Sequence, residues 1–149
     1  MEFKGQEKIG APQATVWAYV TDANKISECA PGLQSVEVID DERFKMVVRV
    51  GVGPVRSEFD LTCTWVERNE PSRARINASG QAPGSAVSMD ATMDLAPDGD
   101  GATVMDWAAE ARISGKLAGL GSRLINPVAD RMTKQVFECI RAKLEQPAS

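Results

Sequence analysis

The sequence predicts an α+β domain in which a curved, seven-stranded antiparallel sheet surrounds a long C-terminal helix. Two short helices are expected after the first strand. Apolar and polar residues alternate through the middle of the chain between turn-forming clusters, which indicates strands, and apolar residues then recur at helical spacing towards the C-terminus. The 149 residues are 43% hydrophobic and 26% charged, as expected for a single core. We therefore expect one domain over residues 1–146 and a short tail at 147–149.

The N-terminal elements are marked by their boundary residues. A short strand is expected over Glu2–Ile9. Pro12 is suited to a first helical turn, because its missing N–H would be unpaired there anyway. Asp22 can accept hydrogen bonds at the start of a second short helix. The turn Cys29–Gly32 should end that helix, since a residue before proline avoids the α region and glycine accepts a positive φ.

Six further strands are expected where apolar residues occupy alternate positions. Their cores are Val36–Val38, Phe44–Val50, Phe59–Trp65, Ala74–Ala78, Val87–Leu95 and Thr103–Ala109. The clearest alternation runs from Phe59 to Trp65, where Glu58 and Asp60 fall on the polar face and are interpreted as solvated carboxylates. The connecting turns are predicted at Asp40–Asp41, Gly51–Pro54, Gly80–Gly84 and Pro97–Gly101.

The C-terminal helix has an apolar residue at every fourth position. The repeat comprises Leu120, Leu124, Val128, Met132, Val136, Ile140 and Leu144. Such a repeat drifts by about 40° per step relative to a straight α-helix, so something should reset its phase. The best candidate is Asn126-Pro127, where either a kink or a division into Lys116–Ile125 and Pro127–Glu145 is expected.

Composition excludes several classes of function. The net charge is −4 with both signs interspersed, which argues against a nucleic-acid partner. The chain has no histidine, so the common Ser/His and Cys/His nucleophile arrangements are excluded. Three widely spaced cysteines make disulfides and a zinc site improbable, and Cys63 is expected to be an inert inward thiol. No export signal or membrane-spanning stretch is visible, so we expect a cytoplasmic protein with peripheral membrane contact at most.

The inward positions favour an apolar cavity between the sheet and the long helix. They are rich in methionine and alanine and have few large aromatics, so the side chains need not fill the enclosed space. An ordinary filled core fits the same pattern equally well. The predicted cavity walls are Met46, Val48, Phe59, Leu61, Met89, Met93, Trp107, Leu120, Leu124 and Val128. No catalytic residue and no metal ligand is assigned.

Several segments resemble one family. Cys29-Ala30-Pro31-Gly32 is similar to the CxPG turn of the G-subunit family of carbon monoxide dehydrogenase. Gly84–Ala86 opening a strand, and Ala102–Trp107 followed by Ile113–Ile125, resemble the same family. The resemblance covers nearly the whole chain and implies a START-like helix-grip fold (the SRPBCC superfamily) around an apolar cavity. It also implies an accessory factor of a molybdenum-containing carbon monoxide dehydrogenase or related hydroxylase, rather than a catalyst.

The expected ligand is a quinone or another isoprenoid lipid, held without any covalent cofactor. The alternative is a START-like enzyme of the cyclase or lyase type that acts on a hydrophobic small molecule, and a third is an interaction module with a filled core. Members of the family often carry a C-terminal tail thought to hold the membrane, whereas this sequence ends at Ser149. Either such a tail is missing from this sequence, or contact with the inner face of the membrane uses another surface, for which Leu117, Leu120 and Leu124 are the best candidates.

Overall fold

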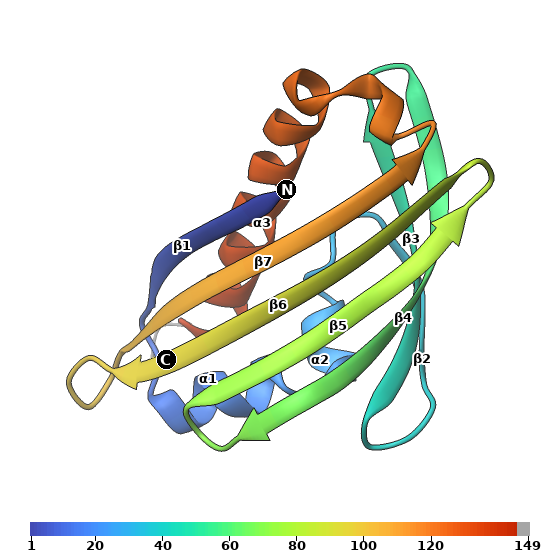
Figure 1. Cartoon of the computed structure of the whole chain (residues 1–149). Coiled ribbons are helices and arrows are strands. Elements are labelled where there is room, and N and C mark those ends of the chain that lie inside the picture. The colour runs from blue at the N-terminus through green and yellow to red at the C-terminus, as the bar shows by residue number, and fades with distance from the viewer. Residues whose placement is uncertain (146–149) are drawn as a thin grey trace.

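The computed structural model describes residues 1–145 and contains one antiparallel sheet of seven strands in the order β1-β7-β6-β5-β4-β3-β2. The elements are β1 (Glu2–Ile9), α1 (Gln13–Val20), α2 (Ala23–Ser27), β2 (Leu33–Val38), β3 (Arg43–Val52), β4 (Val55–Asn69), β5 (Arg73–Ala82), β6 (Ser85–Pro97), β7 (Thr103–Gly115), the 3₁₀ turn η1 (Ala118–Leu120) and α3 (Ser122–Leu144). The predicted fold class is therefore confirmed (Figure 1). The predicted domain end at residue 146 and the tail at 147–149 lie outside the described residues.

The second short helix begins where the sequence predicts, whereas α1 begins at Gln13, because Pro12 is extended (φ −61°, ψ 151°) and is the N-cap rather than part of the first turn. The Asp22 carboxylate accepts the backbone N–H groups of Asn24 at 3.0 Å and Lys25 at 3.2 Å, so it is the N-cap of α2. After α2 the chain turns at Gly32, which has φ +77°. The Gly32 carbonyl accepts the N–H of Arg49 at 2.9 Å, which joins this turn to β3.

The predicted alternation is confirmed along the sheet, with Phe44, Phe59, Cys63 and Trp65 buried on the concave face. The turn predicted at Gly80–Gly84 is too long, because β5 continues to Ala82 and the reversal uses Pro83 and Gly84. Gly80 belongs to the strand instead. A Cβ built there would lie 1.8 Å from the carbonyl oxygen of Asp60 on β4, so glycine permits close backbone approach rather than a turn.

The predicted division of the terminal helix at Asn126-Pro127 is wrong. α3 runs without interruption from Ser122 to Leu144, and the break comes earlier, at Gly121 with φ +77° after η1. Pro127 lies in the second turn of α3. Proline at this position removes the hydrogen bond that its N–H would have donated to the Arg123 carbonyl, and its ring crowds the same carbonyl, yet the helix continues through it.

α3 crosses the open, concave side of the sheet (Figure 1). Its main backbone contacts with the sheet are to β1 and β3, which lie towards opposite sides, rather than to the central β5 and β6. Of its 23 residues, Ile125, Phe137 and Ile140 are buried. The helix therefore bridges the curved sheet instead of lying flat on its middle strands.

A disulfide joins Cys29, just after α2, to Cys139 in α3. The expectation of no disulfide is therefore wrong. The two residues are 110 positions apart in the chain, yet their Cα atoms are 5.5 Å apart. Because α3 folds back over the α1–α2 end of the sheet, it brings together cysteines whose spacing in the sequence gives no sign of proximity.

The core divides into two clusters along α3. The larger lies at the α1 end and includes Ile9, Val16, Met105, Phe137 and Ile140. The smaller lies towards the β3–β4 hairpin and is formed by Val48, Val52, Phe59, Ala82, Leu117 and Ile125. Met46 and Leu61 pack against both clusters. The predicted cavity walls belong to these two groups, except for Leu124, which is exposed and lies in neither cluster.

Candidate ligand-binding interior and its edge

Several predicted wall residues point inward but are not fully buried. Met46, Leu61, Met89, Met93 and Trp107 lie on the concave face, and each is half-buried. Side chains that face inward under a helix are normally almost completely buried in a filled core. Their partial exposure means that solvent-accessible space reaches the concave side of the sheet. Val48 and Phe59, at 6% and 3% exposure, are packed more tightly.

The three predicted residues at the start of α3 differ in their positions. Leu120 and Val128 are half-buried against the smaller core cluster. Leu124 is 42% exposed, and its Cδ1 lies 3.4 Å from the position of a Cβ on Gly53, so it covers the β3–β4 turn. Leu117 is 7% exposed and belongs to the smaller cluster. The expectation that Leu117 offers a membrane contact is therefore wrong.

Trp107 occupies the centre of the inner face on β7. Its ring packs on Phe137 of α3 with ring centroids 5.9 Å apart. The opposite residue on β1 is Gly5, where an added Cβ would lie 3.0 Å from the indole ring, so only glycine leaves room for it. The indole Nε1–H is buried and has no hydrogen-bond partner among residues 1–145. A buried donor of this kind is available to a ligand or a water molecule.

The buried polar residues within 1–145 are Ser27, Ser85 and Thr103, and the side chain of each makes a hydrogen bond within the fold. Ser27 donates to the Ala23 carbonyl, Thr103 donates to the Ala11 carbonyl at 2.8 Å, and Ser85 accepts the Leu117 N–H at 3.0 Å. Burial raises the pKa of the Cys63 thiol to about 11, so the thiol is protonated near neutral pH, as expected for an inert cysteine.

Sequence reasoning missed an inward carboxylate. Glu7 alternates with exposed residues of β1 and pairs with Arg141 of α3 at 3.1 Å. Both side chains are about two-thirds buried, with exposures of 29% and 32%. The alternation from Phe3 to Ile9 was the available signal, since it places Glu7 on the inner face of β1. This pair joins the sheet to α3 near the C-terminal end of the helix.

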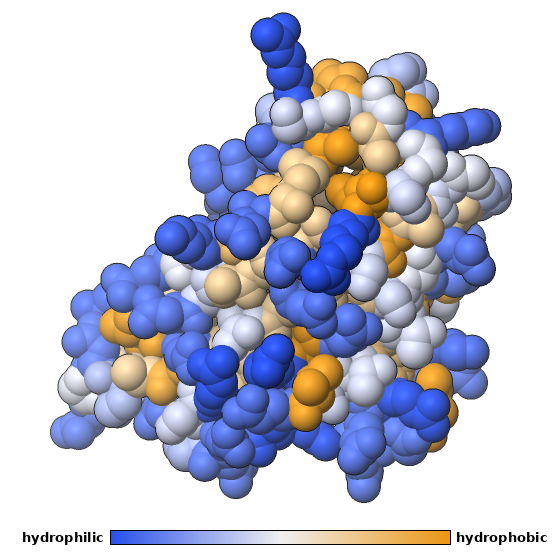
Figure 2. Space-filling model, viewed as in Figure 1, coloured by the Kyte–Doolittle hydropathy of each residue, from blue (hydrophilic) through white to orange (hydrophobic). Residues whose placement is uncertain are grey.

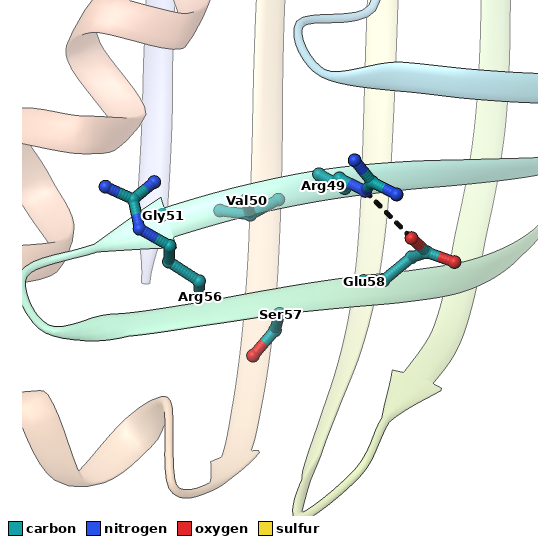
Figure 3. Close-up of a pocket in the computed structure, with 6 residues that line it drawn as sticks. All are labelled: Arg49, Val50, Gly51, Arg56, Ser57 and Glu58. Carbon is teal, nitrogen blue, oxygen red and sulfur yellow. Dashed lines mark hydrogen bonds and ion pairs between the residues drawn. The ribbon is translucent and has the colours of Figure 1, made fainter.

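Two hollows lie where β3 meets β4 and α3, and neither was expected from the sequence. The larger, of about 290 Å³, is lined by Arg49, Val50, Gly51, Arg56, Ser57 and Glu58 (Figure 3). The smaller, of about 170 Å³, is lined by Pro31, Gly32, Arg49, Val50, Gly51, Val128, Arg131, Met132 and Gln135. Val128 is the predicted wall residue that lines one of them. The available signal was the pair of arginines, Arg49 and Arg56, that flank Gly51 and Gly53; the turn predicted at Gly51–Pro54 is too long, since β3 continues to Val52 and only Gly53 and Pro54 make the reversal.

The surface around this end of the molecule combines apolar and strongly polar side chains. Figure 2 shows hydrophobic residues gathered around a small opening where the start of α3 approaches β7, with strongly hydrophilic side chains projecting beside them. Within residues 1–145 no group of His, Cys, Asp and Glu side chains is arranged to hold a metal ion. In the same residues, no helix has the length and apolar character needed to cross a membrane.

A model of the CoxG family, the G-subunit family of carbon monoxide dehydrogenase, matches residues 5–145. The chain belongs to the CoxG family. The predicted resemblance is therefore confirmed over nearly the whole chain, and the family name associates this CoxG protein with carbon monoxide dehydrogenase as an accessory subunit. A comparison with curated proteins found no match.

Solved structures show that this CoxG chain has a START-like fold. A conserved protein from Geobacillus kaustophilus has a TM-score of 0.90 at 22% identity, with 97% of this chain and 95% of that chain covered. A START superfamily protein from Mycobacterium smegmatis has a TM-score of 0.71 at 11% identity, with 97% of both chains covered. The Zhui aromatase/cyclase from Streptomyces sp. R1128 has a TM-score of 0.69 at 13% identity, with 97% and 93% covered.

Proposed function

We propose that this CoxG protein is a non-catalytic accessory protein that binds an apolar, lipid-like ligand between the sheet and α3. The observation that carries the proposal is the partial exposure of inward-facing Met46, Leu61, Met89 and Met93 beneath α3. Flexible thioether side chains adapt to ligands of irregular shape. A quinone or another isoprenoid lipid is the ligand class that such walls accept, and the unpartnered Trp107 N–H could donate to a carbonyl oxygen.

Family membership supports the accessory role in this proposal. The partner is a molybdenum-containing carbon monoxide dehydrogenase or a related hydroxylase. An oxidising enzyme in water must pass electrons to an acceptor that is soluble in the membrane. A domain that shields this acceptor from water could couple the enzyme to the membrane. The protein would then work in the cytoplasm, in peripheral contact with the inner face of the membrane.

The experiment begins with the purified full chain. Extraction into organic solvent followed by mass spectrometry should recover a lipid that co-purifies with the protein. Titration of delipidated protein with a water-soluble short-chain quinone should then quench the fluorescence of Trp107, because its indole lies on the inner face. A Trp107→Phe variant provides the matched control for that signal. Absence of both a co-purified lipid and saturable quinone binding would contradict the proposal.

A START-like enzyme is the second candidate function. It is favoured by the fold shared with the Zhui aromatase/cyclase and by the inward Glu7–Arg141 pair, which could take part in proton transfer. Incubation with the recovered ligand separates the two functions, since an enzyme converts it and a carrier returns it unchanged. Conversion that is lost in Glu7→Gln would favour the enzyme.

A further inference from the structure

The edge of β3 next to α3 has a concentration of hydrogen-bond donors. β2 begins at Leu33, which is paired with Val48, and Gly32 accepts the N–H of Arg49. No residue of β2 lies opposite Gly51. Backbone groups along an antiparallel strand point alternately to its two sides, so the Gly51 N–H, like that of Arg49, is directed away from β4. It is directed towards the open edge and the 170 Å³ hollow.

Side chains add positive charge around this unpaired edge. Arg49 and Arg131 line the smaller hollow together with Gln135. Arg56 reaches over Gly51 from β4, with its Nη1 3.4 Å from the position of a Cβ on that glycine. Figure 3 shows Arg49 and Arg56 rising from the same side of the β3–β4 hairpin, on either side of Gly51. The residues that line the smaller hollow include no acidic side chain.

One carboxylate partly offsets these three guanidinium groups. Glu58 pairs with Arg49 at 3.0 Å, but both side chains are more than half exposed, at 52% and 67%. Exposed pairs of this kind contribute little and are readily exchanged for another anion. Within residues 1–145, no carboxylate lies within ion-pair distance of Arg131 or Arg56. The edge therefore has a surplus of positive charge in a protein whose net charge is −4.

The inner wall of the smaller hollow is apolar. Val50 of β3 and Val128 and Met132 of α3 line it, and Val50 and Val128 pack against the core cluster that contains Phe59. The hollow thus joins a cationic rim to hydrophobic side chains that lead into the fold. Its volume of about 170 Å³ suits a head group rather than a long hydrocarbon chain.

We propose that this edge binds the phosphate group of a lipid whose hydrocarbon chain enters between β3 and α3. Guanidinium groups bind phosphate oxygens through paired, charge-assisted hydrogen bonds, and an unpaired backbone N–H adds a further donor. This inference rests on the proposed function in one respect only, namely that the hydrocarbon chain of the lipid lies in the interior of the protein. The phosphate belongs either to a single bound lipid or to a lipid still in a membrane.

The test uses delipidated full-length protein and calorimetric titration with dihexanoyl phosphatidic acid as a monomeric probe. Arg49→Gln and Arg131→Gln should each weaken binding about tenfold, the usual effect of losing a hydrogen bond to a charged group. Glu58→Gln should strengthen binding by up to about fivefold, because it releases Arg49. Arg75→Gln is the matched control, since Arg75 is exposed on β5, has no ion pair among the described residues and carries the same charge.

Other probes identify the source of the phosphate. Arginine-dependent binding of the monomeric probe supports a single bound lipid, whereas arginine-dependent binding to phosphatidylglycerol vesicles alone supports a head group in a membrane. The inference is overturned if neither probe binds, if Arg75→Gln weakens binding as much as Arg131→Gln, or if inorganic phosphate binds as tightly as the lipid. Quinone titration of Arg131→Gln should be unchanged, so failure of this inference is distinguishable from failure of the proposed function.

Discussion

Single side chains on the inner face determine what the interior can do. Cys63 lies on β4, is 1% exposed and remains protonated near neutral pH, so it offers no nucleophile. The indole N–H of Trp107 is a hydrogen-bond donor that has no acceptor among the described residues. Both residues are surrounded by apolar groups, so the interior would select ligands by their shape and hydrophobicity.

The raised pKa of Cys63 predicts a loss of stability at high pH. The unfolded thiol releases its proton near its ordinary pKa of 9.0, whereas the folded thiol keeps it up to about 11. Stability from this residue is therefore complete below pH 9 and falls between pH 9 and 11, by about 2–3 kcal/mol in total. Urea unfolding across this range should show the fall in wild type relative to Cys63→Ala. Parallel curves for the two proteins would show that Cys63 titrates normally.

Ala91 tests whether the interior is hollow. It lies inward at the centre of β6, opposite Ala109 of β7, and is half-buried. If space adjoins it, Ala91→Phe should change the free energy of unfolding by less than about 1 kcal/mol and abolish quinone binding. In a filled core the same change would cost about 1–3 kcal/mol or more. Urea unfolding and quinone titration check the two effects, with Thr92→Phe, on the other face of the strand, as the control.

At the scale of elements, the rotation of α3 about its axis decides which residues face the sheet. Gly121, with its positive φ, starts the helix at Ser122, and this start turns Ile125 inward to 8% exposure while Leu124 remains at the surface. The proline at 127 does not interrupt the helix. The helix presents few buried residues to the sheet because it spans between β1 and β3.

This rotation predicts opposite results for two neighbouring residues. Ile125→Ala should lower the free energy of unfolding by about 2–4 kcal/mol, because it empties a buried position in the smaller core cluster. Leu124→Ala should cost less than about 1 kcal/mol, since its side chain is largely exposed. Chemical denaturation of the two variants compares them directly. A larger effect at Leu124 would mean that the helix is rotated as its four-residue repeat suggests.

At the scale of the whole molecule, the Cys29–Cys139 disulfide ties the layer formed by α3 to the turn after α2. Cross-linking residues so far apart in sequence removes freedom mainly from the unfolded chain. The helix is also held by the Glu7–Arg141 pair and by Phe137 against Trp107. These contacts all lie in the C-terminal half of α3, whereas its N-terminal half is held by the packing of Ile125 and Val128 in the smaller core cluster.

Reduction should therefore destabilise the protein strongly. The loop-entropy model gives about 4–5 kcal/mol for a disulfide that closes a loop of this length. The thermal unfolding midpoint should fall when a dithiol reductant is added, and Cys29→Ser/Cys139→Ser should show the lowered midpoint without responding to reductant. An unchanged midpoint in the double variant would show that the disulfide contributes nothing in solution.

The fold could be predicted because its signals are local. Alternation from Phe59 to Trp65 gives a strand, and Asp22 gives a helix start, whatever the rest of the chain does. The disulfide could not be predicted, because its two cysteines meet only after α3 folds back. The cationic edge was missed for a similar reason. This edge exists because the pairing of β2 with β3 does not reach Gly51. The register between two strands cannot be predicted from the sequence of either strand alone.

The disulfide also determines how the molecule would carry a mechanical load. A pull on Met1 and Glu145 would pass through β1, α1 and α2 to Cys29, cross the sulfur–sulfur bond and leave through the last residues of α3. Residues 30–138, which include β2 to β7 and the donor-rich edge of β3, would carry almost no tension. Once β1 had separated from β7, the disulfide would keep residues 30–138 inside a closed covalent ring that the pull could not extend.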